Sequence, residues 1–283
     1  MCNYRSSPIL TEVTFSANSA TYGGGMENSI SSPTLIEVTF FANSAGYGGG
    51  MINGGSSPTL MEVTFYANSA NISGGGMYNS TGNPTMTSVT FFANSAFSGG
   101  GIYNYNYSTP TLTNVIFVGN TATSSGAGMV NEESNPTLTN VTFTSNAAAS
   151  SGGGISNYFS SPTLTNAILW GNTPNPIYND TSTPVVTYSD IQGGYTGEGN
   201  INQDPLLGPL ADNGGFNQTH ALLAGSPAID AGSPTTCPAS AVCRCGPSPS
   251  SRRRSRASTD RPTSSGPRPC CPSRPPAFRS RVP

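Results

Sequence analysis

Residues 33–53 read PTLIEVTFFANSAGYGGGMIN, and residues 58–79 repeat the pattern as PTLMEVTFYANSANISGGGMYN. The proline that opens each copy returns every 25 or 26 residues along most of the chain. These prolines are Pro8, Pro33, Pro58, Pro84, Pro110, Pro136 and Pro162. A period this regular indicates an architecture built from one repeated structural unit.

Each unit contains the signals of about three short strands separated by corners. The triplet Val-Thr-Phe alternates apolar and polar residues, which predicts a strand with one face turned inward. Asn follows three residues after the Phe, and a glycine run ending in Met or Ile precedes a second Asn. Such a unit suits one turn of a parallel β-solenoid, in which turns stack about 4.8 Å apart. We therefore predict an all-β solenoid of about eight turns, each of 25 or 26 residues.

Composition supports a β fold and divides the chain. Only 8% of the residues are charged, and 34 Gly and 24 Pro exclude long helices. Residues 1–243 hold twelve acids and one arginine, a net charge of −11, whereas residues 244–283 hold ten arginines and one aspartate, a net charge of +9. We predict repeats over residues 1–192, a closing segment over 193–236 and a disordered Arg/Pro/Ser tail over 237–283.

Two motifs resemble known families. Phe-x-x-Asn paired with Gly-Gly-apolar is similar to the repeat of the polymorphic outer-membrane proteins and related surface proteins. The stretches DPLLGPLADNGG (204–215) and GSPAIDAG (225–232) resemble the closing segment of the choice-of-anchor class. The resemblance implies a right-handed parallel β-helix, an extracytoplasmic location and a passive or adhesive role. It brings no established catalytic residue.

The two ends of the chain depart from that resemblance. No apolar run approaches the roughly 18 residues of a membrane helix, and the first residues lack the pattern of a signal peptide. Met1 precedes Pro8 by the same seven positions as Met26 precedes Pro33. We therefore expect an extracellular or outer-membrane surface protein whose signal peptide is lost upstream of Met1.

The basic tail has two interpretations. Residues 240–243, Ser-Ala-Val-Cys, match what the family's continuing sequence gives when it is translated one base out of frame, which favours a frame-shifted tail. Alternatively, the arginines at 252–254 and 256 form a basic arm for nucleic acid or another polyanion. We favour the first interpretation and expect no nucleic-acid partner.

The residue types of the repeats give little support for a catalytic function. Polysaccharide lyases need a Lys or Arg base, and the repeats contain only Arg5. Hydrolases need clustered carboxylates. The acids that stack are Glu12, Glu37 and Glu62, one per turn, and they either bind Ca²⁺ or remain solvated. A non-catalytic protein is favoured, and a carbohydrate-active enzyme of the same fold is the alternative.

The best candidate for a binding site is aromatic. Alternation places Phe41, Tyr66 and Phe92, each following a strand Phe, on the outside of three consecutive turns. They could contact glycans or a surface protein, which would suit adhesion. Alternatively, the rings only cover one another along the ladder. In the closing region we interpret His220 as a hydrogen-bonding corner residue, and the acids Asp190, Asp204, Asp212 and Asp230 as turn formers.

Overall fold

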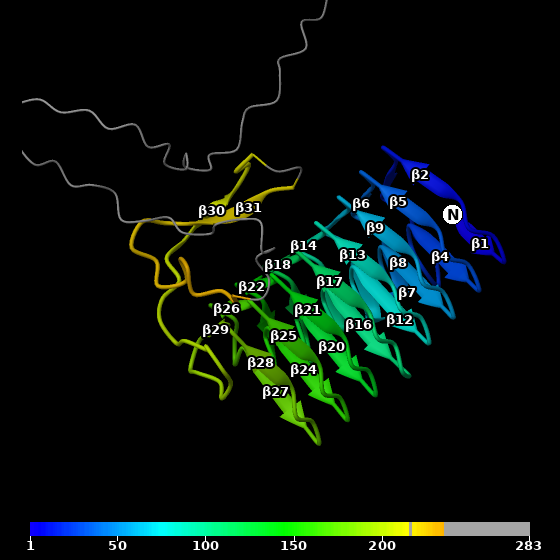
Figure 1. Cartoon of the computed structure of the whole chain (residues 1–283). Coiled ribbons are helices and arrows are strands. Elements are labelled where there is room, and N and C mark those ends of the chain that lie inside the picture. Colours follow the sequence, from blue (N-terminus) through cyan, green and yellow to red (C-terminus); the bar gives the residue numbers. More distant parts are fainter. Residues whose placement is uncertain (215–216, 235–283) are drawn as a thin grey trace, which may run out of the picture. The chain divides into compact units, whose positions relative to one another are not determined.

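The computed structural model describes residues 1–214 and 217–234. These residues form strands and no helix, and the strands coil into a parallel β-solenoid (Figure 1). Three of its sheets contain eight strands each, so the chain passes eight levels that span about seven complete turns. The predicted solenoid is confirmed, and its right-handedness stays a prediction. In the described part of the chain no helix is long and apolar enough to cross a membrane.

Four parallel sheets run along the solenoid. The first sheet consists of β1 (Cys2–Tyr4), β4 (Met26–Ser29), β8 (Met51–Gly54), β12 (Met77–Ser80), β16 (Ile102–Tyr105), β20 (Met129–Glu132), β24 (Ile155–Tyr158) and β27 (Ile177–Asp180). The second sheet consists of β2 (Ile9–Thr11), β5 (Thr34–Ile36), β9 (Thr59–Met61), β13 (Thr85–Thr87), β17 (Thr111–Thr113), β21 (Thr137–Thr139), β25 (Thr163–Thr165) and β28 (Val185–Thr187).

The third sheet consists of β3 (Thr14–Ser16), β6 (Thr39–Phe41), β10 (Thr64–Tyr66), β14 (Thr90–Phe92), β18 (Ile116–Val118), β22 (Thr142–Thr144), β26 (Ile168–Trp170) and β29 (Asp190–Ile191). The fourth sheet consists of β7 (Ser44–Tyr47), β11 (Ser69–Ser73), β15 (Ser95–Ser98), β19 (Thr121–Ala122) and β23 (Ala147–Ala148). The fourth sheet adds a strand to the three expected in each turn. Its inward side chain is a small Ala, so its apolar signal in the sequence is weak.

The register places equivalent residues of successive turns on top of one another. Phe65 pairs with Phe40 on one side and with Phe91 on the other. Six such rings, from Phe15 to Phe143, stack through the core with centroids 4.3–5.0 Å apart and planes within 9°. Columns of Leu, Val and Met complete this core, so burial of apolar area holds the turns together.

Buried asparagines form ladders that fix the register. Asn68 donates from its backbone N–H and from Nδ2 to Oδ1 of Asn94, each at 3.0 Å. Its Nδ2 also donates to the carbonyl of Phe40 at 2.9 Å, and its Oδ1 accepts two equivalent bonds from Asn43. Because each amide is satisfied by the same residue one turn away, a shift of one position would leave buried polar groups unpaired.

The glycine run is required at one corner of the turn. Gly48 has a φ of +63°, which favours glycine. A Cβ at Gly50 would lie 2.6 Å from the carbonyl oxygen of Gly76 and 2.8 Å from the ring of Phe65. The glycines therefore let the backbone of one turn approach both the next turn and the core ring.

Beyond β29, the closing segment folds back along the outer face of the third sheet. It contains the antiparallel hairpin of β30 (Leu207–Ala211) and β31 (Thr219–Leu222). After the hairpin's first strand, Asn217 accepts a bond from Thr64 Oγ1 at 3.3 Å and donates to the carbonyl of Ser88. The predicted disorder of residues 237–283 concerns residues outside the described ranges.

We predict that Asn68→Ala lowers the free energy of unfolding by about 3–5 kcal/mol, because it leaves several buried groups without partners. Asn83→Ala is the matched control. Asn83 is exposed, and its Oδ1 accepts a bond from Thr109 N–H that water can replace. Asn83→Ala should lower the free energy of unfolding by less than about 1 kcal/mol. Urea denaturation followed by circular dichroism measures both, and equal losses would contradict the role of the buried ladder.

Candidate functional site

The predicted aromatic column lies on the outer face of the third sheet. Phe40, Phe65 and Phe91 point into the core, and the next residues, Phe41, Tyr66 and Phe92, point outward. Phe41 is 41% exposed and Tyr66 is 38% exposed, whereas Phe92 is half-buried. The alternation of the strand therefore predicts the direction of these side chains correctly.

The rings of this column stack on one another. The centroids of Phe41 and Tyr66 lie 5.2 Å apart, and those of Tyr66 and Phe92 lie 5.1 Å apart, with planes tilted by 22° and 7°. Mutual covering along the ladder, one of the two interpretations of this column, thus occurs. It leaves two end faces without an aromatic neighbour: the residue in register beside Phe41 is the small, exposed Ser16, and the residue in register beside Phe92 is the buried Val118.

A groove of about 450 Å³ runs between this column and the closing segment. Its walls are the three rings, the outward threonines of the same strands, and three residues of the closing segment: Phe41, Tyr66, Phe92, Thr39, Thr64, Thr90, Leu210, Asn217 and Gln218. Thr90 is only 5% exposed, and within the described part of the chain its Oγ1 has no hydrogen-bond partner. The groove therefore combines an aromatic wall with hydroxyl and amide groups.

The glutamate column occupies a strained corner. Glu12, Glu37 and Glu62 have φ values of 55°, 57° and 59°, a region in which Asn is tolerated better than Glu. Later turns place Asn114, Asn140 and Asn166 at the equivalent corner. No group of three or more His, Cys, Asp or Glu suited to a metal ion occurs in residues 1–214 and 217–234. Calcium binding by the glutamates stays a prediction.

A second aromatic array was missed in the sequence. Tyr22, Tyr47, Tyr78 and Tyr103 contact one another in succession with centroids 5.4–5.9 Å apart. Burial raises the pKa of Tyr78 to about 12. It also raises the pKa of Tyr103, whose hydroxyl donates to Glu132. The spacing of 25 residues between Tyr22 and Tyr47 matched the repeat and could have revealed the start of this array.

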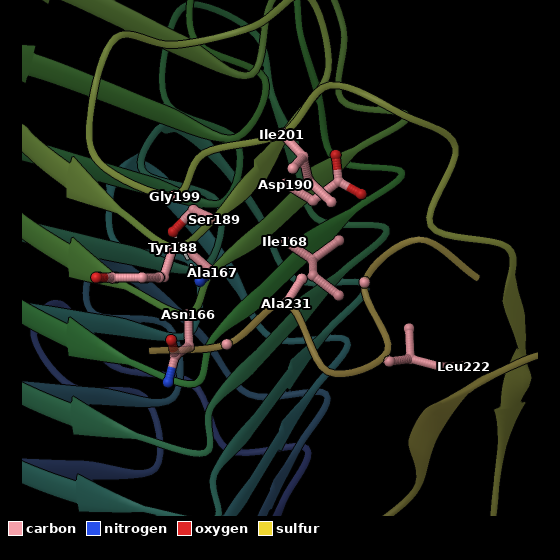
Figure 2. A pocket seen from close by; sticks show the side chains of 12 residues that line it. Asn166, Ala167, Ile168, Tyr188, Ser189, Asp190, Gly199, Ile201, Leu222 and Ala231 are labelled. Atoms are coloured by element: carbon pink, nitrogen blue, oxygen red, sulfur yellow. Dashed lines mark hydrogen bonds between the residues drawn. The ribbon is translucent and has the colours of Figure 1, made fainter. Parts of the chain in front are cut away.

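A smaller cavity of about 180 Å³ lies where the last turns meet the closing segment (Figure 2). Asp190 on β29 lines it and is 3% exposed. Its Oδ1 accepts a bond from the backbone N–H of Gln203 at 3.2 Å, and its Oδ2 has no hydrogen-bond partner among the described residues. Burial raises the pKa of this carboxyl, the hydrogen bond from Gln203 partly opposes this rise, and the charge of Asp204 adds to it. The interpretation of Asp190 as a turn former is therefore wrong.

The other polar residues of the closing region, Asp204, Asp212 and His220, form hydrogen bonds or close contacts with backbone groups nearby. Asp204 and Asp212 accept bonds from the backbone N–H groups of Leu206 and Gly214, both at 2.9 Å, as turn-forming aspartates do. His220 lies in strand β31 rather than at a corner, and its Nδ1 is 2.7 Å from the carbonyl oxygen of Gly208.

Comparison with known proteins supports the repeat. The model of the Chlamydia polymorphic membrane protein repeat matches residues 140–158. No curated protein and no solved structure matches the chain. The matched repeat indicates a surface or outer-membrane protein of the β-helix type. The resemblance of the closing segment to the choice-of-anchor class stays a prediction.

The buried carboxyl predicts a pH-dependent stability difference between the parent protein and Asp190→Asn. A carboxyl whose pKa is higher in the folded than in the unfolded state contributes to the free energy of unfolding. This contribution is fully present below the pKa of the unfolded state and is lost as pH rises through the pKa of the folded state. The stability of Asp190→Asn relative to the parent should therefore increase as pH rises from the ordinary pKa of 3.8, and then level off. Urea denaturation at fixed pH steps measures it. A difference independent of pH would contradict the burial of an ionisable group.

Proposed function

We propose that the chain belongs to a non-catalytic protein of the cell surface or outer membrane that binds glycans through the aromatic groove. One observation carries the proposal: three consecutive turns place rings along a groove of about 450 Å³ whose other walls offer hydroxyl and amide groups. This volume falls within the range of about 300–1,000 Å³ typical of ligand sites.

The chemistry of the groove suits a sugar. The open face of Phe41 can stack against the C–H face of one sugar ring. The hydroxyls of Thr39 and Thr64 and the amide of Gln218 lie where they can exchange hydrogen bonds with sugar hydroxyls. Tyr66 stacks between Phe41 and Phe92, and Phe92 lies in register between Tyr66 and the buried Val118, so these two rings contribute their edges. We therefore expect one dominant stacking position rather than three.

Binding is favoured over cleavage by the residues of the groove. Glycoside hydrolysis generally uses two carboxyl groups that flank the scissile bond. The described residues that line the groove are aromatic, hydroxyl-bearing, amide or aliphatic, and none is Asp or Glu. A rigid rod with a glycan-binding groove suits adhesion. A carbohydrate-active enzyme of this fold would be supported by release of new sugar ends from a polysaccharide.

We predict that Phe41→Ser weakens retention on a glycan array by about tenfold or more, equivalent to about 1.4 kcal/mol, because it removes the open ring face. Serine is the residue that Ser16 already places in the same column. Tyr22→Ser is the matched control, because Tyr22 is 49% exposed at the end of the tyrosine array and is absent from the groove. The melting temperature of each variant verifies folding.

The control separates the two aromatic surfaces. Loss of retention in Phe41→Ser but not in Tyr22→Ser supports the groove. Unchanged retention in Phe41→Ser, or a loss confined to Tyr22→Ser, would remove the groove as the site. If the parent protein bound a protein ligand and no glycan, the proposed glycan partner would be wrong.

A further inference from the structure

The outer face of the second sheet carries a regular array of threonines in four consecutive turns. Strands β13, β17, β21 and β25, which lie side by side in Figure 1, each read Thr-X-Thr. The middle Met or Leu is fully buried in the core, so both threonines point outward. We call these residues the threonine face. The register stacks them in two columns: Thr85, Thr111, Thr137 and Thr163, and Thr87, Thr113, Thr139 and Thr165.

The fold does not require this uniformity. In the first sheet the equivalent outward position changes from Glu27 to Ile52 and then to Tyr78. In the second sheet itself, earlier turns place Ile36 and Met61 in the second column. Threonine favours strands, but Val and Ile favour them as well. Repetition of one residue type at both outward positions, with no buried partner to impose it, indicates a ligand that has a repeat of its own.

The hydroxyl groups of the threonine face are available to water. The first column is exposed, and the second is exposed at Thr87 and half-buried beyond it. Thr165 Oγ1 lies 3.3 Å from Oγ1 of Thr187 in the next turn. Among the described residues, the other hydroxyls of the face form no hydrogen bond with the protein. Ser57 at the preceding corner differs, because its Oγ accepts a bond from the backbone N–H of Asn83.

The hydroxyl groups form a rigid grid in two directions. Successive turns repeat at about 4.8 Å, and alternate residues of one strand repeat at about 6.6 Å. The side-chain torsion of Thr has few allowed values, so each hydroxyl and methyl group follows the backbone. At the adjacent corner, Asn140 donates to Asn114 at 3.2 Å and Asn166 donates to Asn140 at 3.0 Å. A rigid grid loses little conformational entropy when it binds a periodic surface.

The threonine face begins where the glutamate column ends. Glu12, Glu37 and Glu62 occupy the corner after the second-sheet strand in the first three turns, and the next four turns place Ser88, Asn114, Asn140 and Asn166 there. The face and this part of its border therefore carry no ionisable side chain. Charged groups hold hydration shells of their own, whereas hydroxyl groups both donate and accept bonds as water does.

These features select a solid made of water. In ice, oxygen atoms repeat in rows at spacings similar to those of the two threonine columns, so the hydroxyls can join the lattice while the methyl groups lie between its oxygens. The aromatic rings that stack on sugars are absent from this face. We propose that the threonine face binds the surface of ice crystals. This ligand is distinct from the glycan assigned to the aromatic groove, which lies on the third sheet.

The test measures thermal hysteresis, the gap between the melting point of an ice crystal and its freezing point in a solution of the full chain. The parent should show such a gap and should shape the crystal. Thr137→Tyr places a ring in the middle of the face and should reduce the gap severalfold. Thr121→Tyr is the matched control, because Thr121 is exposed on β19 in the fourth sheet. Tyr suits strands, and the melting temperature of each variant verifies folding.

Two further arms complete the experiment. Phe41→Ser should keep the full thermal hysteresis, because it alters the aromatic groove and leaves the threonine face intact. Adsorption to crystalline chitin tests the other periodic surface. The proposal is overturned if the parent neither shapes ice nor shows thermal hysteresis, or if Thr137→Tyr matches the parent. It is also overturned if Thr121→Tyr or Phe41→Ser loses as much as Thr137→Tyr. Adsorption to chitin that Thr137→Tyr abolishes, without thermal hysteresis, would assign the face to a polysaccharide.

Discussion

The superposition of equivalent residues in successive turns is the constraint on which the rest of the structure depends. A buried amide has two donors and an acceptor, and Asn68 meets this demand through Asn43, Asn94 and the carbonyl of Phe40. The stacked Phe rings need the same register, since their centroids lie less than 5.1 Å apart. The asparagine and phenylalanine columns therefore require the same spacing and register between successive turns. A turn placed correctly for one column is placed correctly for the others.

Side chains on the outer faces of the sheets do not have to match from turn to turn. The candidate sites lie on these outer faces. In the third sheet the inward position is Phe from β3 to β22, but the outward position next to it changes from Ser16 to Phe41, Tyr66 and Phe92 and then to Val118. A side chain on the outside is free to vary because no buried partner depends on it. The closing segment then covers part of this face, and the aromatic groove and the Asp190 cavity form along its contact with the rod.

The sequence revealed those features that are encoded within one period of the repeat. The inward Phe column, the asparagine ladders and the direction of Phe41 follow from local alternation and spacing. The fourth sheet was missed because Ala45 and its equivalents give a weak apolar signal. Asp190 was misinterpreted because its burial depends on Leu222 and Ala231, which lie more than 30 positions later and outside the repeat. Contacts between the rod and a non-repetitive segment leave no period to detect.

The pattern of polar satisfaction separates the framework from the functional regions. Inside the rod, the buried asparagines find partners from turn to turn, as their ladders require. Among the described residues, three buried side-chain atoms lack a partner: Thr90 Oγ1, Asp190 Oδ2 and His220 Nε2. Two of them lie on the outer face of the third sheet and the third lies in the closing segment. Proteins tolerate such local violations mainly where function requires them. Because residues of the closing segment line the cavity beside Asp190, the burial of this carboxyl arises from the contact between the rod and the closing segment and not from the repeat itself.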